Sequence, residues 1–183
     1  FYSPEDVAGF IEKLRGDLYT AIFEFQLRTL VGDKPTATEI EDLSNLAQRG
    51  YQCYLRAEQR INCRKLPYSC FDLWQNRSLM SIQLAQRQVI YVQQMIQASA
   101  TNNQLKIMDL HLKSAVTHFE STLKDCNQMS LRPPRFAFID KRQLTALEGL
   151  ASVLSTAISA EHSVLSATLE SVLNAATLPM RSA

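Results

Sequence analysis

Apolar residues recur every three or four positions through almost the whole chain, and only a few short segments interrupt this pattern. Such spacing places apolar side chains along one face of an α-helix. With 5 Gly and 6 Pro among 183 residues, the chain has few points at which a helix would end. It therefore predicts an all-α fold, an antiparallel up-down bundle of about five long helices at residues 4–30, 37–64, 69–98, 102–129 and 140–178.

Residues typical of helix ends mark where these stretches begin and stop. Ser3 fits the N-cap of the first stretch, and Pro4 fits its first helical position. Pro67 is expected to end the second helix, and Pro133 with Pro134 makes the clearest break in the chain. A chain of this length buries about 70% of its unfolded surface. We therefore expect one domain spanning the whole chain.

Apolar stripes identify the faces expected to line the core. The expected core stripe of the first helix consists of Val7, Ile11, Leu14, Leu18, Ile22 and Phe25. The expected inward face of the second helix consists of Ile40, Leu43, Ala47, Gly50, Tyr54, Ala57 and Ile61. The third helix carries two neighbouring stripes, one containing Ile82 and the other Met80, and is therefore expected to pack on two sides.

The last predicted helix is the longest and the least charged. From Gln143 onward its charged residues are Glu148, Glu161, Glu170 and Arg181. Unbroken, it would be about 50–60 Å long at about 1.5 Å per residue, against about 40 Å for each of the others. Its wide apolar face fits the central helix of the bundle, or a face that binds a partner helix, a second copy or an apolar ligand. The candidate partner face consists of Leu147, Leu154, Ile158, Leu165 and Val172.

Four cysteines lie on or beside the predicted helices. Cys63 and Cys70 flank the short break after the second helix and can meet across it. Cys53 and Cys126 can meet if the second and fourth helices touch. These are the two predicted disulfides, although four cysteines allow three pairings. Disulfides are typical of oxidising compartments, so they favour secretion. The alternative is four reduced thiols in an intracellular protein.

Arg15-Gly16-Asp17 is the sharpest short motif in the chain. Many integrin ligands present this RGD triplet, and the following Leu18 resembles ligands that present it at the start of a helix. Ala21 stands where those ligands have Leu or Ile. The alternative is one face of a regular helix, in which Gly16 costs about 1 kcal/mol relative to Ala.

The remaining polar motifs give weaker signals. Asn76-Arg77-Ser78 is an N-glycosylation sequon, which requires secretion and an exposed Asn76. His111 and His118 share a helix face about 10 Å apart, too far for one metal ion. The net charge of +1 argues against nucleic acid as a partner. A basic ridge on the second helix could bind phosphate groups, but such ridges are usually solvated and paired with neighbouring carboxylates. It consists of Arg49, Arg56, Arg60, Arg64 and Lys65.

The sequence contains no HExxH, GxSxG or glycine-rich phosphate loop, so it predicts no enzyme activity, metal site or cofactor. It has no run of about 18 apolar residues and no visible signal peptide. Its start at Phe1 fits a processed mature protein or a trimmed chain. We therefore expect a non-enzymatic, secreted or surface-exposed protein that binds a protein partner through helix faces. The alternatives are a cytoplasmic or secretion-system helical scaffold, and a carrier of an apolar small molecule in the bundle interior.

Overall fold

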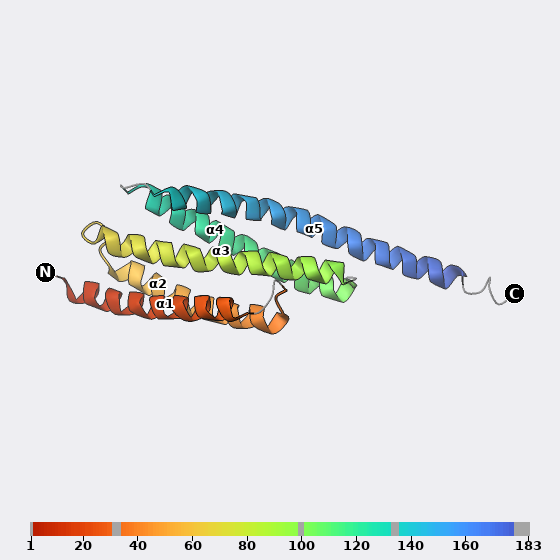
Figure 1. Ribbon diagram of the computed structural model, residues 1–183, viewed down its shortest axis with the longest axis horizontal. Helices are drawn as coiled ribbons and strands as arrows, with labels where there is room; N and C mark the ends of the chain where they lie inside the picture. The colour runs from red at the N-terminus through yellow and green to blue at the C-terminus, as the bar shows by residue number, and fades with distance from the viewer. Residues whose placement is uncertain (1, 31–33, 99–100, 133–135, 178–183) are drawn as a thin grey trace.

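The computed structural model describes residues 2–30, 34–98, 101–132 and 136–177, with side chains of the last helix described through 166 and at 169. These residues form five helices (Figure 1): α1 Pro4–Thr29, α2 Ala37–Arg60, α3 Pro67–Gln97, α4 Asn102–Ser130 and α5 Ala137–Thr177. Consecutive helices run in opposite directions, so the predicted antiparallel up-down bundle is confirmed. α5 extends beyond the ends of the other four helices (Figure 1).

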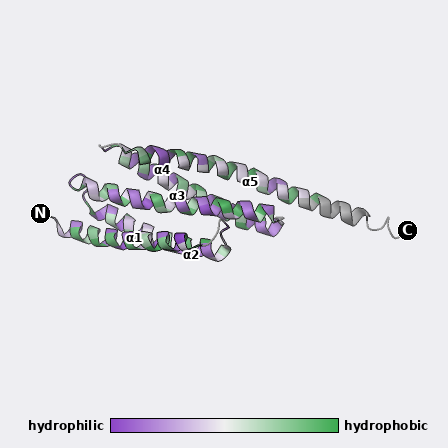
Figure 2. Ribbon diagram, viewed as in Figure 1, coloured by the Kyte–Doolittle hydropathy of each residue, from purple (hydrophilic) through white to green (hydrophobic). Residues whose placement is uncertain are grey.

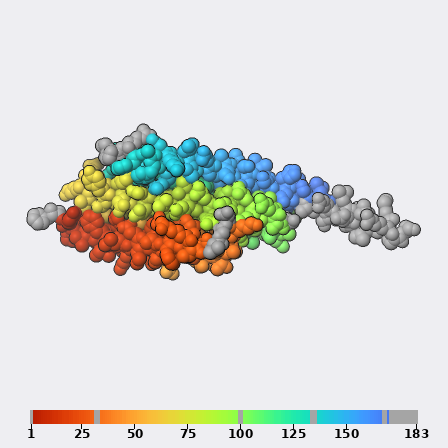
Figure 3. Space-filling view, in the orientation of Figure 1, coloured from red at the N-terminus to blue at the C-terminus, as the bar shows by residue number. Residues whose placement is uncertain are grey.

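The central element is α3, which packs against each of the other four helices. Among the described residues, no Cα atom of α2 lies within 8 Å of one in α4, and the same holds for α1 and α5. By their backbone contacts the helices thus form two three-helix groups that share α3, while side chains such as Tyr51 and His118 bridge α2 and α4. This arrangement leaves α1 and α5 at the two margins of the face in Figure 3, with residues of α3 between them.

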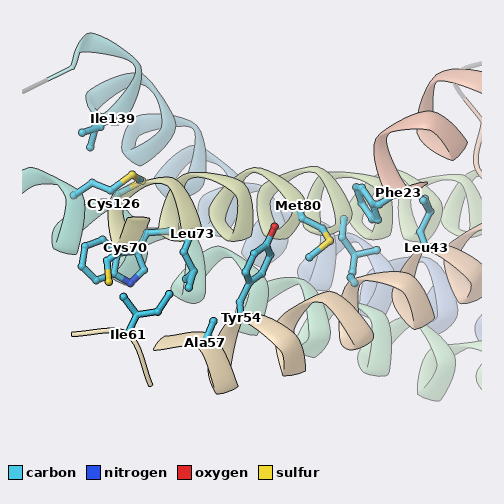
Figure 4. Close-up of a cluster of buried hydrophobic side chains, with 14 residues drawn as sticks. Phe23, Leu43, Tyr54, Ala57, Ile61, Cys70, Leu73, Met80, Cys126 and Ile139 are labelled. Atoms are coloured by element: carbon cyan, nitrogen blue, oxygen red, sulfur yellow. The ribbon is translucent and has the colours of Figure 1, made fainter. Parts of the chain in front are cut away.

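Two clusters of buried side chains surround α3. The first lies among α1, α2 and α3, around Tyr54 and Trp74, and also receives Cys126 and Met129 from the end of α4 and Ile139 from the start of α5 (Figure 4). The second joins α3, α4 and α5 around Phe119. Every residue of the predicted inward face of α2 is buried. Both stripes of α3 contribute buried residues, which include Met80 and Ile82, so the prediction of a helix packed on two sides is confirmed.

The predicted core stripe of α1 is wrong. Its six side chains point away from the bundle, with exposed fractions between 41% and 70%. Figure 2 shows hydrophobic positions recurring along the visible side of α1. The exposed stripe, called the α1 row below, consists of Val7, Ile11, Leu14, Leu18, Ile22 and Phe25.

The face of α1 that does pack into the bundle is built mainly from small and charged residues, and it also carries the fully buried Phe23. Gly16 lies so close to Tyr54 that a Cβ on this glycine would come within 2.5 Å of the ring. Gly9 makes a similar approach at the end of α2. The buried Glu12 accepts a hydrogen bond from Arg56 Nε at 3.0 Å. Because small residues let the two backbones approach closely and the buried carboxylate has a partner, this face packs instead of the bulky stripe.

Two predicted helix boundaries at the connection between α2 and α3 were also wrong. α2 ends at Arg60 rather than at residue 64, because the backbone of Ile61 turns to an extended conformation, with φ −74° and ψ 126°. Pro67 does not end α2, which stops before it; instead it occupies the first turn of α3. Its missing N–H is harmless there, because the first N–H groups of a helix have no intrahelical acceptor.

Candidate interaction surface

The outward face of α5 carries the residues predicted to contact a partner. Leu147, Leu154, Ile158 and Leu165 are between 54% and 65% exposed. The side chain of Val172 lies outside the described residues. The described exposed large apolar side chains of this face, called the α5 row below, are Leu144, Leu147, Leu154, Ile158, Leu165 and Leu169.

A second row of α5 faces the bundle, so the helix is apolar on two sides. Val153, Ala160 and Val164 are buried in the cluster shared with α3 and α4. An apolar face of a helix is normally covered by another part of the protein or by a partner. The second row has its partner within the chain, and the α5 row has none among the described residues.

The two exposed rows differ in the charges that accompany them. Glu148 and Glu161 are exposed on α5, and from Gln143 to the end of this helix the sequence has no Lys or Arg. The α1 row is flanked by the exposed guanidinium groups of Arg15 and Arg28. Each of these arginines has a neighbouring carboxylate on α1 itself, at 3.1 Å and 3.9 Å respectively.

The RGD triplet lies within α1, where two of its three residues serve the α1–α2–α3 contact. Asp17 accepts a hydrogen bond from the Tyr54 hydroxyl at 2.9 Å and another from Asn76 Nδ2 at 3.0 Å. Lys13 bonds the other carboxylate oxygen at 2.7 Å. Gly16 is buried, and only Arg15 is exposed. Because the carboxylate is already bound within the protein, this geometry supports a packing role and not presentation to an integrin.

The sequon is held in the same contact. Asn76 is half-buried on α3, and its amide nitrogen, the atom that a glycan would modify, donates to Asp17. Ser78 of the sequon is fully buried. The exposed Asn76 that glycosylation requires is therefore not present in the folded protein, because α3 is the central helix and this part of its surface faces α1.

A buried ion pair joins α3 to α4. Arg77 donates to both carboxylate oxygens of Asp125, at 2.9 and 2.7 Å, and to Glu58 of α2 at 2.9 Å. Glu58 also accepts from the indole nitrogen of Trp74 at 2.7 Å. Burial opposes ionisation of Glu58, but the hydrogen bonds from Arg77 and Trp74 hold its pKa below the usual value. The cluster fixes the register of α2, α3 and α4.

One of the two predicted disulfides forms. Cys63 and Cys70 are bonded across the connection between α2 and α3, with Cα atoms 5.7 Å apart. The predicted bond between Cys53 and Cys126 is wrong, and both are free, buried thiols. A disulfide needs Cα atoms within about 7 Å, whereas among the described residues no Cα atom of α2 lies within 8 Å of one in α4. Burial raises the pKa of Cys126 to about 11, so this thiol is a poor nucleophile near neutral pH.

His111 and His118 on α4 each pack against a tyrosine. His118 Nδ1 lies 3.4 Å from the Tyr51 hydroxyl, and burial lowers the pKa of His118 to about 4. The His111 ring packs edge-on against Tyr91, and burial lowers the pKa of His111 as well. Within the described residues, no three His, Cys, Asp or Glu side chains converge in a way that could hold a metal ion.

A groove of about 490 Å³ runs along α3 between the end of α1 and the first half of α5. Leu27 and Gly149 line its two sides, and Gln83, Gln86 and Gln93 are among its α3 residues. The groove is open to solvent. A carrier of an apolar molecule would need to bury most of its ligand, so this groove gives the carrier alternative little support.

No known protein family, curated protein or solved structure matches this chain. The functional assignment therefore rests on the surfaces themselves. None of the helices in the described ranges combines the length and hydropathy that crossing a bilayer requires.

The sequence predicted that the α1 row lines the core, whereas it is exposed to solvent. A signal was present in the small residues Gly9, Gly16 and Thr20, which recur at helical spacing on the opposite face. Glycine within a helix is unfavourable, and two glycines seven residues apart indicate a line of close helix contact. That line is where α2 packs.

Proposed function

We propose that this protein is a non-enzymatic binding protein that engages a helical protein partner through the α5 row. One observation supports the proposal most directly. Leu147, Leu154, Ile158 and Leu165, which the sequence predicted to contact a partner, are more than half exposed, while the adjacent row of α5 is buried in the core. The 147–151–154–158 spacing of three and four residues is the spacing at which one helix packs against another.

The energetics fit a helix as the partner. Complete burial of one Leu or Ile side chain is worth about 1.5–3 kcal/mol. Covering the exposed halves of six such side chains is therefore worth roughly 6 kcal/mol. Association itself costs an estimated 4–15 kcal/mol. Stable binding thus requires a partner that follows the row along its length, as a helix does, and contributes apolar residues of its own.

Secretion or display on a cell surface is part of the same proposal. The bond between Cys63 and Cys70 supports an oxidising compartment. A chain of 183 residues can bury a sufficient core without a disulfide, so the bond is more simply explained by the compartment than by a need for stability. An intracellular scaffold acting through the same face is the alternative, and the redox state of this pair in natively purified protein distinguishes the two.

Site-specific crosslinking tests the α5 row as a contact surface. A photoreactive residue at Leu154 or Ile158 is expected to capture the same protein repeatedly from the native source. Position Lys113, exposed on α4, is the matched control and should capture it far less. The double variant L147Q/L165Q should abolish capture while leaving the circular dichroism spectrum unchanged. Equal capture from α4 and α5, or survival of capture in the double variant, would contradict the proposal.

A further inference from the structure

The two margins of the bundle carry complementary apolar rows that do not meet within one chain. The α1 row extends over 19 residues, from Val7 to Phe25, and the α5 row over 26 residues, from Leu144 to Leu169. At about 1.5 Å per residue these lengths are about 27 Å and 38 Å. The α1 row therefore fits along the α5 row over its whole length.

Charge favours this pairing over either row pairing with itself. Two α5 rows would bring Glu148 and Glu161 together with their own copies, and the second half of α5 has no Lys or Arg to compensate. Two α1 rows would likewise bring Arg15 and Arg28 together with their own copies. An α1 row against an α5 row places guanidinium groups beside carboxylates. The present contacts of the two arginines on α1 are exposed pairs, which are weak and easily exchanged.

We propose that the occupant of the α5 row is the α1 row of a second copy of this chain. The inference rests on the proposed function, because it names the partner of the same face. Such a contact is heterologous: each copy uses one surface to bind and leaves the other surface free for the next copy. α1 and α5 lie at opposite margins of one chain (Figure 3), so the same contact can repeat and add further copies.

Complementation of two blocked variants tests the pairing. L14E/L18E blocks the α1 row and leaves the α5 row intact, and L154E/I158E does the reverse. All four positions are at least 60% exposed, so neither variant removes a buried side chain. L110E, at an exposed position of α4, is the control for adding a surface carboxylate. The melting temperature of each variant monitors folding, and light scattering coupled to size exclusion gives the mass.

The expected result is specific to a heterologous contact. Wild type and L110E form species larger than a dimer, whose mass increases with concentration. Each double variant alone is monomeric, and an equimolar mixture of the two forms a 1:1 dimer of twice the monomer mass. Adding E148K/E161K to the variant with the intact α5 row should weaken that dimer several-fold, and a moderate rise in salt should weaken the unmodified dimer in the same direction.

Three outcomes would overturn the inference. Dimers of L14E/L18E alone would show pairing between two α5 rows, and dimers of L154E/I158E alone would show pairing between two α1 rows. Wild type that stays monomeric at every concentration would exclude a second copy as the occupant. If crosslinks from Ile158 still capture a different protein in that case, the proposed function stands and only this inference fails. If the crosslinks also vanish, both fail.

Discussion

Gly16 of α1 lies directly against the aromatic ring of Tyr54 on α2, and the Tyr54 hydroxyl forms hydrogen bonds with two other residues of α1. A Cβ on Gly16 would come within 2.5 Å of Tyr54 Cε1. The hydroxyl contacts Thr20 Oγ1 at 2.8 Å and donates to Asp17 at 2.9 Å. The ring is thus held at both its side and its tip, and α1 can occupy this position only because residue 16 has no side chain.

Gly16→Ala should therefore destabilise the protein. In an unconstrained helix the same change would stabilise by about 1 kcal/mol. Here the added methyl group must displace a ring whose hydroxyl is fixed, and overpacking of this kind costs about 1–3 kcal/mol. We expect a net loss of about 1 kcal/mol in the free energy of unfolding, measured by urea denaturation. If Y54F restores much of the loss by freeing the ring, the explanation is supported; a more stable G16A protein would refute it.

Leu18 and Leu43 both lie on stripes that the sequence predicted to be buried, but substitutions at the two positions should have very different effects on stability. Leu18, 60% exposed, should tolerate Leu18→Gln with a change within about 0.5 kcal/mol. Leu43 is fully buried in α2, and Leu43→Ala should cost about 2–5 kcal/mol. Denaturation is measured at low protein concentration, so that self-association does not contribute. Equal, large losses for the two variants would mean that α1 packs through its apolar row after all.

This contrast shows how far the sequence determines the fold. Periodicity located all five helices, and the pairing of Thr36 with Glu39 was predictable because the capping box is local; Thr36 N–H donates to the Glu39 carboxylate at 2.8 Å. Periodicity also identified the apolar row of α1, but it cannot state whether the partner of that row belongs to the same chain. Asp17 illustrates the same limit, since its partners lie 37 and 59 residues away in the sequence.

The cysteine arrangement shows which long-range contacts could be anticipated. Cys63 and Cys70 are separated by one short connection, so their approach follows from helix order alone. Whether Cys53 reaches Cys126 depends on which helix is central. The two stripes of α3 indicated that this helix packs on two sides, but they did not indicate how far apart the backbones of α2 and α4 would lie.

A count of thiols tests this arrangement. Protein unfolded without reductant should react with two equivalents of a thiol reagent, at Cys53 and Cys126, and after reduction with four. In the native state both should react slowly, because both are buried. C63S/C70S should lower the free energy of unfolding by about 2–3 kcal/mol, the value expected for a closed loop of this size. No reactive thiol before reduction would show that the second predicted disulfide forms in solution.

His118 predicts how stability should depend on pH. Burial lowers its pKa in the folded protein to about 4, whereas an unfolded histidine titrates near 6.5. Between these values the unfolded chain binds a proton that the folded protein does not. Protonation therefore favours unfolding, and the free energy of unfolding should fall as the pH falls from about 6.5 toward 4. A shift of this size corresponds to a loss of up to about 3 kcal/mol.

His118→Phe isolates this contribution, because the variant removes the titrating group and keeps an aromatic ring beside Tyr51. The ring centroids of Tyr51 and His118 lie 5.5 Å apart. Urea denaturation at pH 7 and pH 5 should show a smaller difference for H118F than for wild type. H162Q, at an exposed position of α5, controls for the removal of a histidine as such. Since burial also lowers the pKa of His111, the difference left in H118F should decrease further in H118F/H111F. An unchanged difference in H118F would show that His118 is accessible to protons in the folded protein.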